Sequence, residues 1–118
     1  MRQPENAFMI LKEDARIRWN QNAEVVHNFI RGMSPYPAAF TILKIGEDEK
    51  YLKIYKGKFE KAAHDKEPRT LEIDKHQFKI HTKDGFYYPE EVQLEGKKRM
   101  SIKDFLNGFQ HFDHISMV

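Results

Sequence analysis

The sequence predicts a mainly β domain in which five or six antiparallel strands form a closed or nearly closed barrel. Three observations lead to this fold class. Short strand-like runs follow one another after residue 38, the connections between them are short, and a chain of 118 residues that is 40% hydrophobic and 13% aromatic has room for one domain with a core. Closing the sheet removes edges that would otherwise pair with other chains. We expect one amphipathic helix before the strands and a short helix after them.

The first expected element is an amphipathic helix over about residues 21–31. One face of it is apolar, at intervals of four and three residues. The residues on this face are Trp19, Ala23, Val26, Ile30 and Met33. Asn20 or Asn22 should cap the first turn through its side-chain oxygen. Gly32, followed by Pro35, should end the helix.

Five runs of residues that favour strands follow, the second of them broken by Gly57. They cover residues 39–45, 51–61, 70–73, 77–82 and 86–94. Turn residues separate the runs, as at 83–85, where a glycine can adopt positive φ. A capping-box pattern from Ser101 to Asp104 then predicts a short helix that Gly108 should end.

The expected organisation is a linker or arm over residues 1–15, one domain over 16–109 and a tail over 110–118. The short apolar segment 7–11 needs a partner surface and would allow weak self-association. No apolar run approaches the roughly 20 residues of a membrane span, so we expect no membrane partner. The sequence contains no cysteine, which fits a reducing compartment and makes the cytoplasm the expected location.

No catalytic constellation stands out. The sequence contains no GxGxxG, GxxxxGK[ST], HExxH or GxSxG motif. The adjacent acids Glu90 and Glu91 would point to opposite faces of a strand. Of the six histidines only His111 and His114 lie close together in the sequence, and a metal site there would need a helix to align the pair and at least one more ligand. We therefore expect no metal, no cofactor in this domain and no catalysis by this domain alone.

The positive charge is concentrated in two segments, although the net charge is only +2. Residues 50–61 hold five lysines and one glutamate, and residues 97–103 hold four cations and no acid. Strand alternation places Tyr51, Lys53 and Tyr55 on one face. Aromatic rings interleaved with cations can bind exposed bases and phosphates. The alternative is an ordinary solvated face along which lysine stems lie.

Lys97, Lys98 and Arg99 follow the glycine of an expected turn and directly precede the C-terminal helix. Such a place brings side-chain charge close to outward-pointing backbone N–H groups, an arrangement that suits a phosphate. The alternative is a charged loop without a ligand.

Five segments closely resemble, in order and spacing, the C-terminal domain of methionyl-tRNA formyltransferase. They are KEDARIRW (12–19), FIRGMSPYPAAF (29–40), LKIY (52–55), VQLEGKKRM (92–100) and DFLNGF (104–109). The resemblance covers about residues 7–109. The block around PYP is shared with sugar-nucleotide N-formyltransferases, so the last two segments carry the closer identification.

The resemblance implies an OB-like Greek-key barrel that a linker joins to an N-terminal catalytic domain. That domain would transfer the formyl group of 10-formyltetrahydrofolate to methionyl-tRNA, while the barrel holds the tRNA on a positively charged surface. The residues nominated for tRNA contact are Tyr51, Lys53, Tyr55, Lys97, Lys98 and Arg99. The alternatives are a structural or interaction barrel of a sugar-nucleotide N-formyltransferase, or a free-standing domain that dimerises through residues 7–11.

The chain departs from the family pattern at three positions. Arg18 stands where the family commonly has an aspartate, and Arg69 stands where a glycine is usual in a turn. Both changes add positive charge, and Arg69 is expected to occupy a turn position that favours positive φ. Ala38, in place of a glycine, is a milder change.

Overall fold

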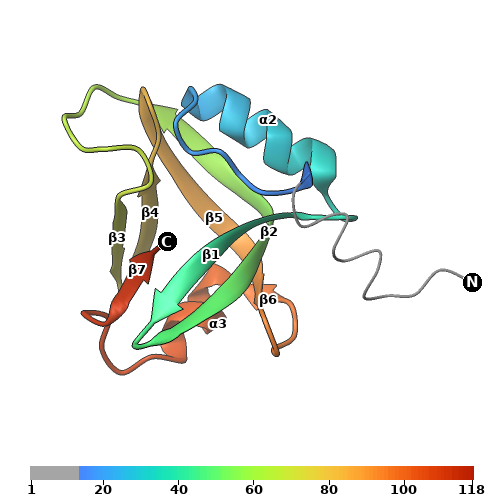
Figure 1. Cartoon of the computed structure of the whole chain (residues 1–118), viewed down its shortest axis with the longest axis vertical. Helices are drawn as coiled ribbons and strands as arrows, with labels where there is room; N and C mark the ends of the chain where they lie inside the picture. The colour runs from blue at the N-terminus through green and yellow to red at the C-terminus, as the bar shows by residue number, and fades with distance from the viewer. Residues whose placement is uncertain (1–13) are drawn as a thin grey trace, which may run out of the picture.

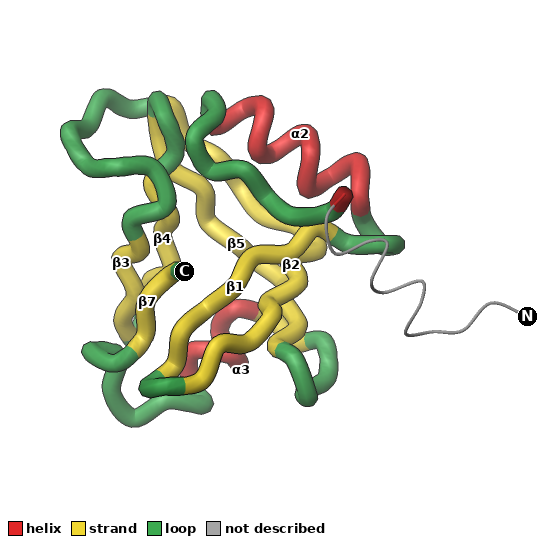
Figure 2. The backbone as a smooth tube through the Cα atoms, in the orientation of Figure 1, coloured by secondary structure: helices red, strands yellow, loops and turns green. Residues whose placement is uncertain are grey.

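The computed structural model describes residues 14–118, and one curled antiparallel sheet forms its centre (Figure 1, Figure 2). The strands are β1 (Ala39–Ile45), β2 (Asp48–Lys61), β3 (Leu71–Asp74), β4 (Gln77–His81), β5 (Gly85–Leu94), β6 (Met100–Ser101) and β7 (Ile115–Met117). They follow the order β3-β4-β5-β2-β1-β7, and β6 pairs with β5. Because β3 and β7 lie beside each other at the two ends of this order, the barrel is nearly closed.

The predicted fold class, a mainly β barrel with a helix near each end, is confirmed. All the long strands contribute fully buried side chains to one core. These include Leu43, Leu52, Ile54, Ile80, Tyr87 and Val92. Two short strands, β6 and β7, add to the five predicted runs. No helix in residues 14–118 has the length and apolar character needed to cross a membrane.

An irregularity lies in the longest strand pair, β2 with β5. The register is regular at Leu52, which faces Leu94, and shifts between Ile54 and Gly57. Gly57 permits the close approach of the two strands there, since a Cβ on it would collide with the carbonyl oxygen of Tyr88. A shift of this kind breaks the in-out alternation of the side chains.

Helix α2 (Ala23–Met33) packs across β2 and β5 and buries Ala23, Val26 and Ile30. It begins and ends two residues later than predicted. Neither predicted cap is made: Asn22 precedes the helix without a side-chain hydrogen bond. Instead the Ala23 N–H donates to a carboxylate oxygen of Asp84 at 2.7 Å. An acidic group from the turn before β5 thus meets the positive end of the helix.

The segment before α2 is extended, so assigning Trp19 to the helical face was wrong. Backbone hydrogen bonds of 2.9 Å link Ile17 N–H to the Phe40 carbonyl and Phe40 N–H to the Ala15 carbonyl. Trp19 is buried and donates from Nε1 to Oγ1 of Thr41 at 3.1 Å. Of the predicted arm, residues 1–13 and with them the apolar segment 7–11 lie outside the described residues.

The C-terminal helix α3 (Ile102–Asn107) begins as predicted. The Asp104 N–H donates to Oγ of Ser101 at 3.1 Å, and Phe105 and Leu106 are buried. The expectation that residues 110–118 form only a tail is corrected for its last part. β7 lies within it and pairs with β1, Ile115 opposite Ile45. Its apolar pattern spans only three residues, which is too short for a periodic signal.

Two non-glycine residues adopt left-handed backbone conformations. Arg69 has φ 81°, as its turn position predicts, and Ala38 has φ 75°. Glycine takes positive φ without steric cost, which fits the glycine that the resemblance implies at both positions.

Candidate nucleic-acid interface

The turn between β5 and β6, residues 95–99, presents three consecutive cations to solvent. Gly96 has φ 84°, and the Lys97 N–H donates to the Leu94 carbonyl at 2.9 Å, which closes the turn. All five residues of the turn are exposed. Within residues 14–118, the side chains of Lys97 and Lys98 make no hydrogen bond or ion pair. We call residues 95–99 the lysine turn.

The third cation of the lysine turn, Arg99, is held by the barrel. Its guanidinium donates to Oε1 of Glu91 at 2.9 Å and lies 3.8 Å from the centre of the Tyr55 ring. The hydrogen bond from Arg99 lowers the pKa of the Glu91 carboxyl below its ordinary value, so the acid is ionised opposite the guanidinium at neutral pH. Much of the Arg99 charge is therefore balanced by Glu91.

Tyr55 does not share the outward face predicted for Tyr51, Lys53 and Tyr55. Its side chain is only 8% exposed, because the register shift after Ile54 buries two consecutive residues. The hydroxyl donates to the side-chain oxygen of Gln93 at 2.7 Å, and burial raises the pKa of Tyr55. With Arg99 over its ring, Tyr55 supports the lysine turn from below. Direct contact of this residue with tRNA stays a prediction.

Tyr51 and Lys53 are half-buried beside the lysine turn. Together with Gln93 and residues 94–96 they line a hollow of about 210 Å³. The pairing of Lys53 with Gln93 across β2 and β5 sets this neighbourhood, and the Gln93 amide donates to the Lys97 carbonyl at 2.9 Å. The rings of Tyr51 and Phe40 pack in a T-shaped arrangement with their centres 5.4 Å apart. The structure thus brings all six nominated residues to one end of the β2–β5 pair.

A second basic surface was not assembled from the sequence. Arg16 and Arg18 alternate with buried Ala15 and Ile17 on the extended segment, and Arg69 lies in the loop before β3. The three arginines line a hollow of about 400 Å³, which also contains Glu67 and Val118. None of the three makes an ion pair with another described residue. We call Arg16, Arg18 and Arg69 the arginine surface.

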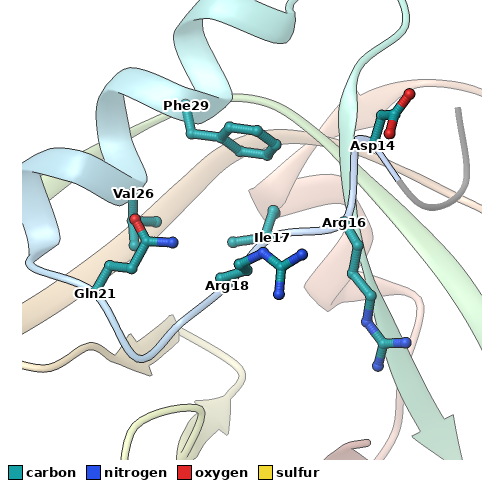
Figure 3. A pocket seen from close by; sticks show the side chains of 7 residues that line it. All are labelled: Asp14, Arg16, Ile17, Arg18, Gln21, Val26 and Phe29. Atoms are coloured by element: carbon teal, nitrogen blue, oxygen red, sulfur yellow. The ribbon is translucent and has the colours of Figure 1, made fainter.

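The alternation of apolar and basic residues over positions 15–19 is the signal that could have revealed this surface. Figure 3 shows the segment beneath α2, with Val26 and Phe29 facing it from the helix. A smaller hollow of about 220 Å³ lies there, lined by Asp14, Arg16 and Arg18 among others. The contribution of Arg69 could not be seen in advance, since it reaches the segment only through the fold.

Comparison with known proteins places these surfaces in a family context. Residues 9–110 match the model of the formyl transferase C-terminal domain. Proteins named methionyl-tRNA formyltransferase are similar: that of Flavobacterium johnsoniae is 40% identical over 107 residues, covering 91% of this chain and 34% of that protein. The one from Parabacteroides distasonis is 45% identical over 104 residues (86% and 32%), and one from Staphylococcus epidermidis 39% over 105 residues (88% and 33%). The chain spans about a third of the length of these relatives.

Proposed function

The chain belongs to the formyl transferase C-terminal domain family, and from this we propose that it is the tRNA-binding domain of a methionyl-tRNA formyltransferase. Its role is to hold methionyl-tRNA so that the aminoacylated end reaches an N-terminal catalytic domain. In this proposal, formyl transfer from 10-formyltetrahydrofolate belongs to that domain, and the barrel contributes binding without catalysis. The relatives named above support the methionyl-tRNA assignment over the sugar-nucleotide alternative.

One observation carries the proposal: the lysine turn presents Lys97 and Lys98 without any described acidic partner, beside Tyr51 and Lys53. A cation that is already paired must lose its partner before it binds a phosphate, whereas these two lysines lose only water and counterions. Phosphate contacts of this kind release counterions from the nucleic acid, so binding weakens steeply as salt rises. Such contacts position a tRNA without reading its sequence.

The direct test compares the chain with its Lys97→Ala/Lys98→Ala variant in binding to initiator tRNA, by filter binding at about 50 and about 200 mM salt. We expect the double variant to bind at least about tenfold more weakly at low salt, with a salt slope shallower by about two. Both side chains are exposed, so the fold should not change.

The matched control is Lys61→Ala/Lys83→Ala, which removes the same charge at the other end of β5. Lys61 pairs with the first residue of β5, and Lys83 lies two residues before the strand, so both lie about 30 Å from the lysine turn, the length of ten strand residues. The control should bind tRNA nearly as the unmodified chain does. Equal losses in both double variants would contradict a specific role for the lysine turn, and binding independent of salt would contradict phosphate contacts.

A further inference from the structure

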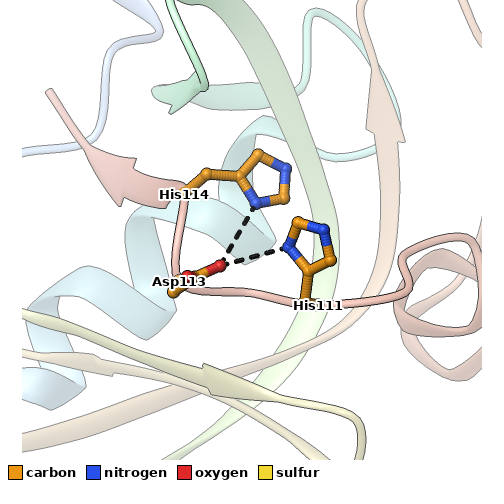
Figure 4. A group of neighbouring side chains, drawn as sticks. All are labelled: His111, Asp113 and His114. Carbon is orange, nitrogen blue, oxygen red and sulfur yellow. Dashed lines mark hydrogen bonds and ion pairs between the residues drawn. The ribbon is translucent and has the colours of Figure 1, made fainter.

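The loop between α3 and β7 gathers two imidazoles and a carboxylate (Figure 4). Nδ1 of His111 lies 3.1 Å from Oδ1 of Asp113, and Nδ1 of His114 lies 3.9 Å from the same oxygen. One ligand atom from each of the three lies within 4.8 Å of the others. The predicted requirements for a metal site here were a helix that aligns the two imidazoles and at least one more ligand. No helix covers residues 111–114, but the turn brings the imidazoles together and Asp113 lies close enough to be the further ligand.

The backbone of this loop is anchored on both sides of the cluster. The His114 carbonyl accepts from the Gly46 N–H at 2.9 Å, and the Ile115 N–H donates to the Phe112 carbonyl at 3.1 Å. Phe109 and Phe112 pack against the core, with their ring centres 5.9 Å apart. The three side chains therefore project from a fixed turn, which reduces the conformational entropy lost when they converge on a ligand.

A second observation points to a ligand at the same place. Nδ1 of His114 is buried and has no hydrogen-bond partner among the described residues. Asp113, at 3.9 Å, is too distant to serve as one. A buried ring nitrogen without a partner is unfavourable, and this nitrogen faces the other two ligand atoms (Figure 4). An ion bound among the three would satisfy it.

We propose that His111, Asp113 and His114 form a binding site for one divalent transition-metal ion, with Zn²⁺ as the probe. Imidazole nitrogen and carboxylate oxygen are ligands that zinc prefers, and three protein ligands leave a coordination position open for water or another group. Each imidazole would bind the ion through Nδ1, which is free to do so in the neutral tautomer that holds its proton on Nε2. The site lies outside the lysine turn and the arginine surface, and the proposal does not depend on tRNA binding.

The bound ion would fasten the loop that leads into β7. This strand pairs through Ile115 with Ile45 of β1 and sits at the end of the strand order. Fastening the loop would hold the nearly closed side of the barrel in place. The effect on the whole fold is a higher unfolding temperature in the presence of metal, because an ion that binds only the folded state stabilises it.

The test is isothermal titration of the untagged 118-residue chain with Zn²⁺ alone. We expect one ion per chain with an affinity in the micromolar range, and His111→Ala and His114→Ala each to weaken it at least about tenfold. Asp113→Asn, which keeps the volume and removes the charge, should also weaken it. The control His76→Ala, an exposed histidine in the β3–β4 turn, should bind as the unmodified chain does.

A second readout is thermal unfolding. At a free Zn²⁺ concentration about tenfold above Kd, Tm should rise by about 5 °C in the unmodified chain and in His76→Ala, and not in His111→Ala. The His111 side chain is 71% exposed and that of Asp113 89%, so these variants should fold normally. The absence of saturable binding would overturn the proposal. So would an affinity in His111→Ala equal to that of the unmodified chain.

Discussion

The lysine turn and the arginine surface each carry three positive side chains, but they differ in how the fold presents them. The lysine turn is one continuous segment in which Lys97 and Lys98 are unpaired among the described residues, while Arg99 is held by Glu91. In the arginine surface, residues 50 or more positions apart in sequence meet around a hollow of about 400 Å³. The difference teaches that charge density along the sequence locates only those basic surfaces that a single segment builds.

The strongest way to sharpen this comparison is charge reversal in the lysine turn. Lys97→Glu/Lys98→Glu should weaken initiator-tRNA binding by about a hundredfold at low salt, since it removes two phosphate contacts and adds repulsion. Circular dichroism and Tm should stay unchanged because both side chains are exposed. If the arginine surface alone held the tRNA, the loss of affinity would be small. The arginine surface, and not the lysine turn, would then be the main tRNA-binding surface.

A smaller effect is expected from Arg18→Asp, which restores the residue common in the family. Arg18 lines both hollows of the extended segment and makes no ion pair with a described residue. We expect tRNA affinity to fall by about threefold to tenfold, because Arg18 would attract the tRNA through the positive potential of the surface without a direct phosphate contact. Filter binding measures the affinity, with Lys83→Asp as the matched charge reversal at a residue that lines neither hollow. Equal losses for the two variants would assign the effect to net charge.

Features that depend on neighbouring residues could be predicted from the sequence, whereas features that depend on which strands pair could not. The capping box at Ser101, the turn at Gly96 before Lys97 and the left-handed position of Arg69 are local features, which neighbouring residues determine, and the structure shows each. The cap of α2 by Asp84 and the burial of Tyr55 depend on which strands meet, and on the register shift after Ile54.

The candidate sites follow the same division. The six residues were nominated from two separate basic segments, and the structure brings them close together because Lys53 and Gln93 pair across β2 and β5 beside the lysine turn. The outward orientation predicted for Tyr55 was wrong, and tRNA contact by the six stays a prediction. The arginine surface was not predicted as a site, and the histidine pair was weighed as a metal site without being predicted to be one. Arg69 reaches Arg16 only in the folded barrel, and the loop holding His111 is shaped by its anchors on the turn before β2 and on Phe112. Neither contact leaves a periodic pattern in the sequence.

The next prediction separates charge from backbone strain in the arginine surface. Arg69 has φ 81°, which is unfavourable for a residue with a Cβ, so glycine should relieve strain in the folded state. Glycine also raises the conformational entropy of the unfolded chain, which offsets part of this gain. The net effect of Arg69→Gly should be a stabilisation of about 1 kcal/mol. Thermal unfolding should show Tm higher by about 4 °C. Ala38→Gly, at φ 75°, is the control that releases similar strain without changing charge. If only Ala38→Gly raised Tm, the Arg69 side chain would contribute contacts that outweigh its strain.

The smallest effect on tRNA binding should come from Arg99, although it belongs to the lysine turn. Arg99→Gln removes a cation that Glu91 already balances, so the affinity should change by less than about threefold. Its clear consequence is electrostatic: without the hydrogen bond from Arg99, the pKa of Glu91 should rise towards its ordinary value. A carbon-13 titration of the Glu91 carboxyl by NMR measures this rise.

The same pair has a defined pH dependence. Because the pKa of Glu91 is lowered in the folded state, the stabilisation from its pairing with Arg99 is present above the unfolded-state pKa and is lost as pH falls through the folded one. Arg99→Gln should therefore lower Tm slightly at neutral pH and not at strongly acidic pH. A loss of tRNA affinity as large as that of Lys97→Ala/Lys98→Ala would show instead that Arg99 leaves Glu91 to bind the tRNA. The three cations of the lysine turn would then act together.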